Sequence, residues 1–530
     1  MVLFTQLIKT ALALLALPIL IAQADSSSCE VTDANACAID SLTASNDDSS
    51  VLIYPGGDTR CAFDDYTDTV TTFASNSTYF FQVFPAANQD KKKLLLFFQG
   101  GGACVDKYTC DFALQCQLGS SALITTQASV TDTGIMNRTL DGNVFNDYNI
   151  VYLPYCTGDL FVGNKYLEPY ESVYNQALGN KQCMGQNQGM YMNGYNNTMA
   201  VLKWALENYP DPEQIVVGGY SAGSLAAQMW SAYVANTWEV ESKSTKFQVL
   251  ADSYVGVFPE YKTPASGLIN YYGGCGLVDF PDAMAAECEA ETATVIEMIT
   301  SLMNEAPSAK WLFIDSISDH TQRRFYELVL LGIAGYPFTT LLPADEFYGN
   351  MTEILDAYSL VMNVTRFNID SDQHVWLTGN DYSSAEDLEG AYLGNILSSW
   401  LAYSTPEATT ATPTSTPEAT TVTPASTTAA PTTKPTPTTA APKTSKPSTT
   451  SQQAQQEQIA QQLKALKEFM CSILSQFHIQ APLLLEGIAG WSFDHFAEYQ
   501  IQAERSPAKR GSTDNSKPSK QDRPPRFARR

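Results

Sequence analysis

The sequence predicts an α/β protein with a doubly wound, mostly parallel sheet, and two kinds of segment support this prediction. Short continuous apolar runs bounded by glycine, proline or polar residues are typical of buried parallel strands. Such runs occur at 94–98, 150–153, 215–217 and 311–314, and a further strand is expected at 247–257. Helical segments are expected between and after them, at 193–209, 222–235 and 321–330. Strands that alternate with helices favour a parallel sheet.

Changes in composition divide the 530 residues into four segments. We expect a signal peptide at 1–24, a folded domain at 25–403, a Thr/Pro/Ser-rich linker at 404–451, and a helical segment with a basic disordered tail at 452–530. The signal peptide is indicated by the apolar run from Ala11 to Ala22, followed by the small-x-small pattern Ala22-Gln23-Ala24. The linker is too polar to bury a core, so it is expected to be either an O-glycosylated, extended stalk or a simple disordered linker.

Cysteine content indicates an extracellular protein, and net charge argues against two classes of partner. A net charge of −25 argues against a nucleic-acid or anionic-membrane binder. Apart from the signal peptide, whose apolar run is too short to span a bilayer, no segment has 18 consecutive apolar residues, so we expect no transmembrane helix. Ten cysteines precede residue 290, an even set typical of disulfides, with Cys29–Cys37 and Cys275–Cys288 plausible as local pairs and Cys471 left over. Scarce histidine and no Cys-x-x-Cys spacing argue against zinc. Possible N-glycosylation sites are Asn76, Asn137, Asn196, Asn350 and Asn363.

The segment Gly219-Tyr220-Ser221-Ala222-Gly223 follows a predicted strand and precedes a predicted helix. This is the context of the nucleophile elbow of α/β-hydrolases, where glycines flank a serine held in a strained, tight turn. The N-terminus of the following helix offers free N–H groups to a developing oxyanion. Ser221 is therefore the candidate nucleophile of an α/β-hydrolase-like fold, and a non-catalytic strand–helix turn is the alternative.

A serine nucleophile requires a base, which is usually histidine. The chain has four histidines, and His478 and His495 lie beyond the linker, so the candidates are His320 and His374. α/β-Hydrolases place the acid and then the histidine after the serine, with the histidine on a late loop, which favours His374. His320 is expected at the start of a helix, on a solvated face.

The orienting acid should follow a strand after the elbow. The strand at 311–314 leads to Asp315 and Asp319, and spacing alone leaves both open, with helix capping as the alternative role of Asp319. The second part of an oxyanion hole is expected in the triple-glycine segment 100–104, whose backbone N–H groups can turn inward. A phosphate-binding loop is disfavoured because no Gly-Lys-Ser/Thr follows the glycines.

Together these motifs resemble the pectin acetylesterase/Notum family of carboxylesterases. The resemblance covers roughly 51–402 and is carried by 100–104, 154–159, 162–164, 208–212, 219–223, Asp319 with Gln322, and Gln373-His374. In that family the catalytic acid stands three residues before a glutamine, as Asp319 does. The resemblance therefore implies catalytic roles for Ser221, Asp319 and His374. It also implies oxyanion donors at the backbone N–H groups of Gly102, Ala103 and Ala222.

The activity implied by the resemblance is that of a secreted serine esterase. Its substrate would be an acetylated polysaccharide such as pectin or another extracellular acyl ester, hydrolysed without metal or organic cofactor. A monomer is the default expectation, and the linker would allow association with a cell wall. Two departures, Ala103 where the family usually has tryptophan and Tyr220 in the elbow, leave the substrate open. The alternatives are a longer acyl group, as for Notum, and a catalytically silent surface-binding module.

Overall fold

A computed structural model describes residues 27–45, 49–67, 74–75, 77–86, 90–112, 133–169, 189–260, 264–332, 338 and 340–402. They all belong to the first of two compact units, residues 1–413. The expected signal peptide at 1–24, the linker at 404–451 and the C-terminal segment at 452–530 lie outside the described residues. So do Cys116, Cys183 and Cys471.

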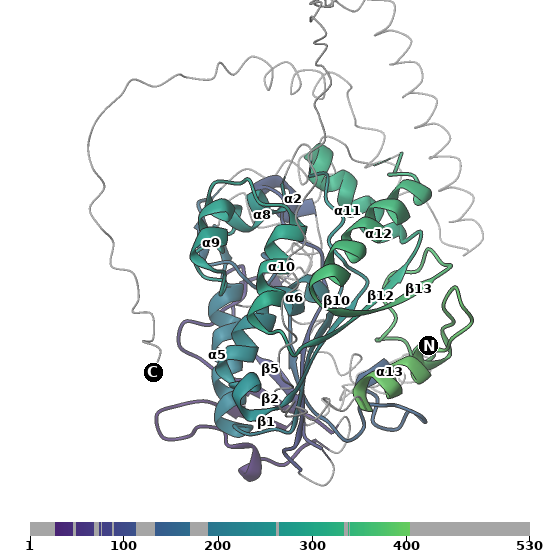
Figure 1. Cartoon of the computed structure of the whole chain (residues 1–530). Helices are drawn as coiled ribbons and strands as arrows, with labels where there is room; N and C mark the ends of the chain where they lie inside the picture. Colours follow the sequence, from purple (N-terminus) through teal and green to yellow (C-terminus); the bar gives the residue numbers. More distant parts are fainter. Residues whose placement is uncertain are drawn as a thin grey trace, which may run out of the picture. The chain divides into compact units, whose positions relative to one another are not determined.

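A nine-stranded sheet forms the centre of this unit (Figure 1). In spatial order its strands are β1 (Ser27–Glu30), β2 (Val51–Tyr54), β5 (Phe81–Phe84), β7 (Asn149–Leu153), β6 (Lys93–Phe98), β10 (Gln214–Tyr220), β11 (Lys246–Asp252), β12 (Lys310–Ser316) and β13 (Asn363–Ile369). All neighbours pair in parallel except β5, which is antiparallel to β2 and β7. This mixed, mostly parallel sheet is consistent with an α/β-hydrolase-like fold. Two small ribbons pair β3 (Tyr66–Thr67) with β4 (Ala74–Ser75) and β8 (Lys165–Leu167) with β9 (Met190–Met192).

Helices cover both faces of the sheet (Figure 1). They are α2 (Lys107–Phe112), α5 (Gly194–Asn208), α6 (Ala222–Thr237), α7 (Val240–Lys243), α8 (Ala265–Tyr271), α9 (Asp282–Glu289), α10 (Val295–Glu305), α11 (His320–Leu331), α12 (Ala344–Val361) and α13 (Leu393–Ala402). Three short 3₁₀ turns lie at Ile39–Ser41, Gly134–Met136 and Tyr382–Ser384. Helices α5, α6, α10 and α12 pack against one face of the sheet, and α13 packs against the other.

Strand β6 shows why the apolar runs are continuous. Leu94, Leu96 and Phe98 belong to the core on one face, whereas Leu95 and Phe97 belong to the core on the other. A strand buried on both sides has no polar face, because its side chains alternate between two helical layers. The same reasoning predicted the strands at 150–153, 215–217 and 311–314, which are confirmed as β7, β10 and β12.

The predicted strand at 247–257 is too long. It ends at Asp252, because Ser253 adopts a φ of +61° and turns the chain out of the sheet. The parallel strands β6, β10, β11 and β12 all end at this edge of the sheet. In open α/β sheets the residues that follow the carboxyl ends of the strands form the binding site.

Four disulfide bonds join cysteines of the described residues. The predicted local pairs Cys29–Cys37 and Cys275–Cys288 are confirmed. Cys104–Cys110 closes a second short loop, and Cys61–Cys156 joins segments separated by 95 residues. In the part of the chain that the structure describes, no helix has both the length and the apolar character needed to cross a bilayer.

Candidate active site

Ser221 lies in the turn between β10 and α6, at the carboxyl edge of the sheet. Its φ of 54° and ψ of −122° are rare for a residue with a side chain, and such strain persists only where the surroundings fix it. Its N–H donates to the carbonyl of Asp252 at 2.8 Å, and its carbonyl accepts the N–H of Ser224 at 2.9 Å. The Ser221 side chain makes no capping hydrogen bond, so its hydroxyl is not used by the helix.

Glycines allow the turn to approach the end of β6. A Cβ added to Gly223 would overlap the carbonyl oxygen of Phe98, and one added to Gly219 would overlap the carbonyl oxygen of Gly223. In the segment that follows β6, a Cβ added to Gly100 would lie 2.8 Å from Cβ of Ser221. The three glycines therefore bring the triple-glycine segment against the candidate nucleophile.

His374 and Asp319 are in direct contact, with Nδ1 of His374 2.8 Å from Oδ2 of Asp319. Asp319 is fully buried, and the His374 side chain is 18% exposed. The other carboxylate oxygen of Asp319 accepts the N–H groups of Thr321 and Gln322 at 2.8 and 2.9 Å, which caps α11. One oxygen of Asp319 thus caps α11, and the other contacts His374.

Asp315 and His320 lie elsewhere in the network. Nε2 of Gln322 donates to Asp315 at 3.0 Å and to Asp319 at 3.1 Å, so the two carboxylates share one amide donor. Burial raises the pKa of Asp315 well above its ordinary value, and its Oδ2 has no partner among the described residues. His320 is exposed at the start of α11. The structure brings His374 to Asp319 and not to Asp315.

The backbone N–H groups of Gly102, Ala103 and Ala222 donate to no described residue. Gly102 has a φ of 72°, which lets the segment after β6 turn, and Ala222 is the first residue of α6. The segment is held in place from outside, because Cys104 donates its N–H to the carbonyl of Gly158 at 2.8 Å. These free donors are of the type that stabilises an oxyanion. Ala103 is only 1% exposed, so its methyl group packs inward.

Nε2 of His374 is buried and has no hydrogen-bond partner among the described residues. A buried polar atom without a partner is unfavourable, and at an active site it marks a group kept free for the reaction. With Nδ1 bonded to Asp319, Nε2 is the nitrogen that can accept a proton from a hydroxyl group.

The sequence pattern does not single out Asp252, the last residue of β11. Asp252 is fully buried between β10 and β12, and burial raises its pKa to about 6. Its carboxylate accepts N–H groups from Trp376 and Leu377, close to His374. The only signal in the sequence is an acid that ends an apolar strand at the same edge as Ser221, a signal that Asp315 shares.

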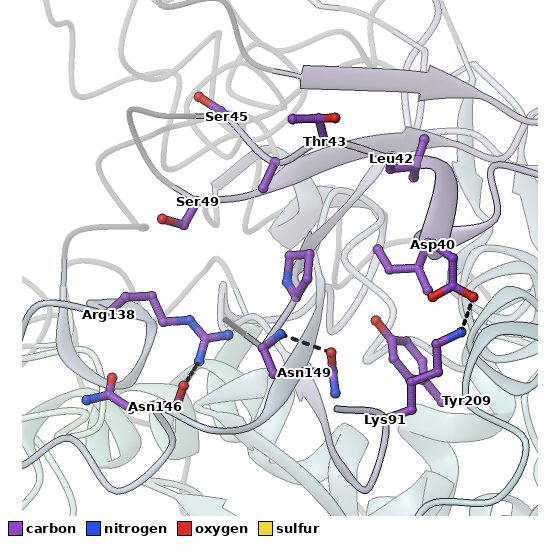
Figure 2. Close-up of a pocket in the computed structure, with 14 residues that line it drawn as sticks. Asp40, Leu42, Thr43, Ser45, Ser49, Lys91, Arg138, Asn146, Asn149 and Tyr209 are labelled. Atoms are coloured by element: carbon purple, nitrogen blue, oxygen red, sulfur yellow. Dashed lines mark hydrogen bonds and ion pairs between the residues drawn. The ribbon is translucent and has the colours of Figure 1, made fainter. Parts of the chain in front are cut away.

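A cavity of about 630 Å³ lies at the opposite edge of the sheet, and Figure 2 shows residues that line it. Asn149, the first residue of β7, lines it, as does Tyr209, which precedes β10. Lys91 forms an ion pair with Asp40 there, and the Arg138 guanidinium donates to four backbone carbonyl groups. Its position at the amino ends of the parallel strands separates this cavity from Ser221. Among the described residues, no group of three or more His, Cys, Asp or Glu side chains could hold a metal ion.

The mostly parallel sheet, with a glycine-flanked serine after its central strand, corresponds to the class of α/β-hydrolase-like proteins. Within that class, the model of the pectinacetylesterase family matches residues 74–273, which confirms the resemblance and implies a carboxylic ester hydrolase. The match includes Gly102, Ala103, Ser221 and Ala222 and ends before Asp319 and His374. No curated protein matches the chain.

Proposed function

We propose that the chain is a secreted serine carboxylesterase that hydrolyses acetyl esters, with pectin or another cell-wall polysaccharide as its substrate. The family match supports ester hydrolysis. The observation that carries the mechanism is the 2.8 Å contact between Nδ1 of His374 and Asp319. The other imidazole nitrogen of His374, Nε2, has no partner among the described residues. The four disulfides support an extracellular location.

In the proposed reaction, Nε2 of His374 takes the hydroxyl proton of Ser221 while Oγ attacks the ester carbonyl carbon. The oxyanion accepts hydrogen bonds from the N–H groups of Gly102, Ala103 and Ala222. The tetrahedral intermediate collapses, and the imidazolium gives its proton to the departing alcohol. Water then attacks the acyl-enzyme with His374 as base, which releases acetate and restores the serine.

The histidine acts through two nitrogens with separate tasks. Asp319 accepts the Nδ1 proton, which selects the tautomer with a free Nε2, and its negative charge stabilises the imidazolium when it forms. Because Asp319 is buried and also caps α11, its orientation is fixed by the fold before substrate arrives. We propose the same boundaries as the sequence indicates for the whole chain, with the catalytic domain at 25–403.

The test is hydrolysis of p-nitrophenyl acetate and of longer p-nitrophenyl esters by the wild type and by Ser221→Ala. We expect Ser221→Ala to lose nearly all turnover, and equal rates in the two proteins would overturn the proposal. His374→Ala should also abolish turnover, whereas His320→Ala, a matched exposed control, should retain it. A rate that rises with acyl length would replace the acetyl preference by a longer acyl group.

A further inference from the structure

We propose that Asp252 and Ser253 are positioning residues that hold the backbone after His374 and thereby set its imidazole relative to Ser221. The proposal rests on the proposed esterase function. Both residues lie within 74–273, the range of the family match. The N–H groups that they bind follow His374 and lie outside that range.

The carboxylate of Asp252 gathers consecutive N–H groups of the histidine segment. Its Oδ2 accepts from Trp376 at 3.0 Å and from Leu377 at 2.8 Å, and its Oδ1 lies 3.2 Å from the Trp376 nitrogen. The hydroxyl of Ser253 donates to Oδ1 of Asp252 at 2.8 Å and accepts the N–H of Val375 at 2.9 Å. The three residues that follow His374 are thus bonded to two neighbouring side chains.

The segment adopts a conformation that it would not hold on its own. Val375 has a φ of 62°, which is rare for a β-branched residue, and Ser253 has a φ of 61°. Strained residues of this kind persist where their surroundings over-determine them. The converging N–H groups form a concave anion-binding arrangement, and Asp252 is the anion that occupies it.

Asp252 also contacts the nucleophile, through a different group. Its carbonyl accepts the N–H of Ser221 at 2.8 Å, and in the sheet it pairs with Tyr220, the residue before the nucleophile. The backbone of Asp252 therefore bonds to the turn that carries the nucleophile. Its side chain bonds to the segment that carries the base. A change at this carboxylate would move His374 relative to Ser221 without altering a contact to substrate.

Asp252 does not duplicate the role of Asp319. Nδ1 of His374 is bonded to Asp319, and the oxygens of Asp252 are occupied by one hydroxyl and the N–H groups of Trp376 and Leu377. The titratable groups that interact with Asp252 are Asp315, on the neighbouring strand, and His374. The structure therefore assigns Asp252 to orientation and not to proton transfer.

The experiment compares Asp252→Asn with Asp159→Asn in the full chain. Asp159 is a matched control, because it is also fully buried and accepts a hydroxyl and two N–H groups, from Thr157, Phe161 and Gly194. It has no hydrogen bond to the residues after His374. The readouts are kcat and KM for p-nitrophenyl acetate and the low-field NMR resonance of the His374 Nδ1 proton.

For Asp252→Asn we expect kcat to fall about 10²-fold with KM nearly unchanged, the size of effect typical of a small misplacement of a catalytic group. The Nδ1 proton resonance should shift or broaden in Asp252→Asn and remain in Asp159→Asn. A wild-type kcat and resonance in Asp252→Asn would overturn the proposal. So would the same change of the resonance in both variants, because that would show a general effect of buried carboxylates.

Ser253→Gly keeps the test decisive if Asp252→Asn fails to fold. Glycine suits the φ of 61° and removes the hydroxyl that binds Val375 and Asp252, while the carboxylate of Asp252 stays. A smaller fall in kcat is therefore expected, and an unchanged kcat contradicts the proposal. If the wild type hydrolyses no ester, the esterase function fails, but the resonance of His374 still decides between positioning and a structural role.

Discussion

Lowering the pH from 7 to 5 should stabilise the folded unit through its buried carboxylates. Asp159 and Asp252 are both fully buried, and burial raises the pKa of each from 3.8 to about 6. Between these values the folded protein holds a proton that the unfolded chain has lost. The stabilisation linked to that proton is complete below pH 3.8 and is lost as the pH rises through 6.

The magnitude follows from the two pKa values. With a folded pKa of about 6 and an unfolded pKa of 3.8, the free energy of unfolding rises by about 1 kcal/mol per group between pH 7 and pH 5. The asparagine of Asp159→Asn cannot titrate, so the free energy of unfolding of this variant should respond to pH by about 1 kcal/mol less than that of the wild type.

The assay is urea unfolding at pH 5 and pH 7 under non-reducing conditions, followed by circular dichroism. Groups common to both proteins cancel in the difference between wild type and Asp159→Asn, which isolates the one carboxylate. If the two proteins respond to pH equally, Asp159 does not titrate in this range. If the variant gains more stability at pH 5 than the wild type does, the sign of the pKa shift is opposite to that argued here.

Three further changes test the acid, the turn at Ser221 and one disulfide bond. Asp319→Asn should lower kcat by about 10⁴-fold, because an amide does not select the required tautomer. The melting temperature should barely change, because asparagine still caps a helix. A large loss of stability with retained kcat would contradict both expectations. Gly223→Ala should reduce kcat/KM at least 10²-fold, since its methyl group would displace the Phe98 carbonyl from the turn, and wild-type hydrolysis of p-nitrophenyl acetate would refute that packing. Replacing Cys61 and Cys156 together by alanine should cost about 4.7 kcal/mol in urea unfolding for a 95-residue separation, and a loss below about 1 kcal/mol would show that the bond constrains the unfolded chain little.

The sequence predicts those parts of the fold whose pattern is local. Strand β10, the turn at Ser221 and helix α6 follow one another without interruption, so their order alone identifies the elbow. The antiparallel direction of β5 has no such signal, because Phe81–Phe84 reads as a buried strand in either direction.

The choice of acid shows where local reasoning stops. Asp315 and Asp319 follow the same strand, and spacing does not say which of them meets His374. The start of α11 decides, because capping fixes one oxygen of Asp319 and turns the other toward the imidazole. Asp252 bonds to Trp376 and Leu377, 124 and 125 positions later, and Ser253 bonds to Val375, 122 positions later. These contacts depend on how β11 and the late loop meet.

The bond between Cys61 and Cys156 also sets an order of events during synthesis. At about 5–20 residues per second, Cys156 leaves the ribosome roughly 5–20 s after Cys61. Cys104 and Cys110 emerge in between and need only a six-residue separation to pair with each other. Cys61 must therefore remain reduced, or exchange a temporary partner, until β5, β6 and β7 have all been made. The yield of correctly paired protein thus depends on thiol exchange in the folding compartment as well as on the stability of the finished sheet.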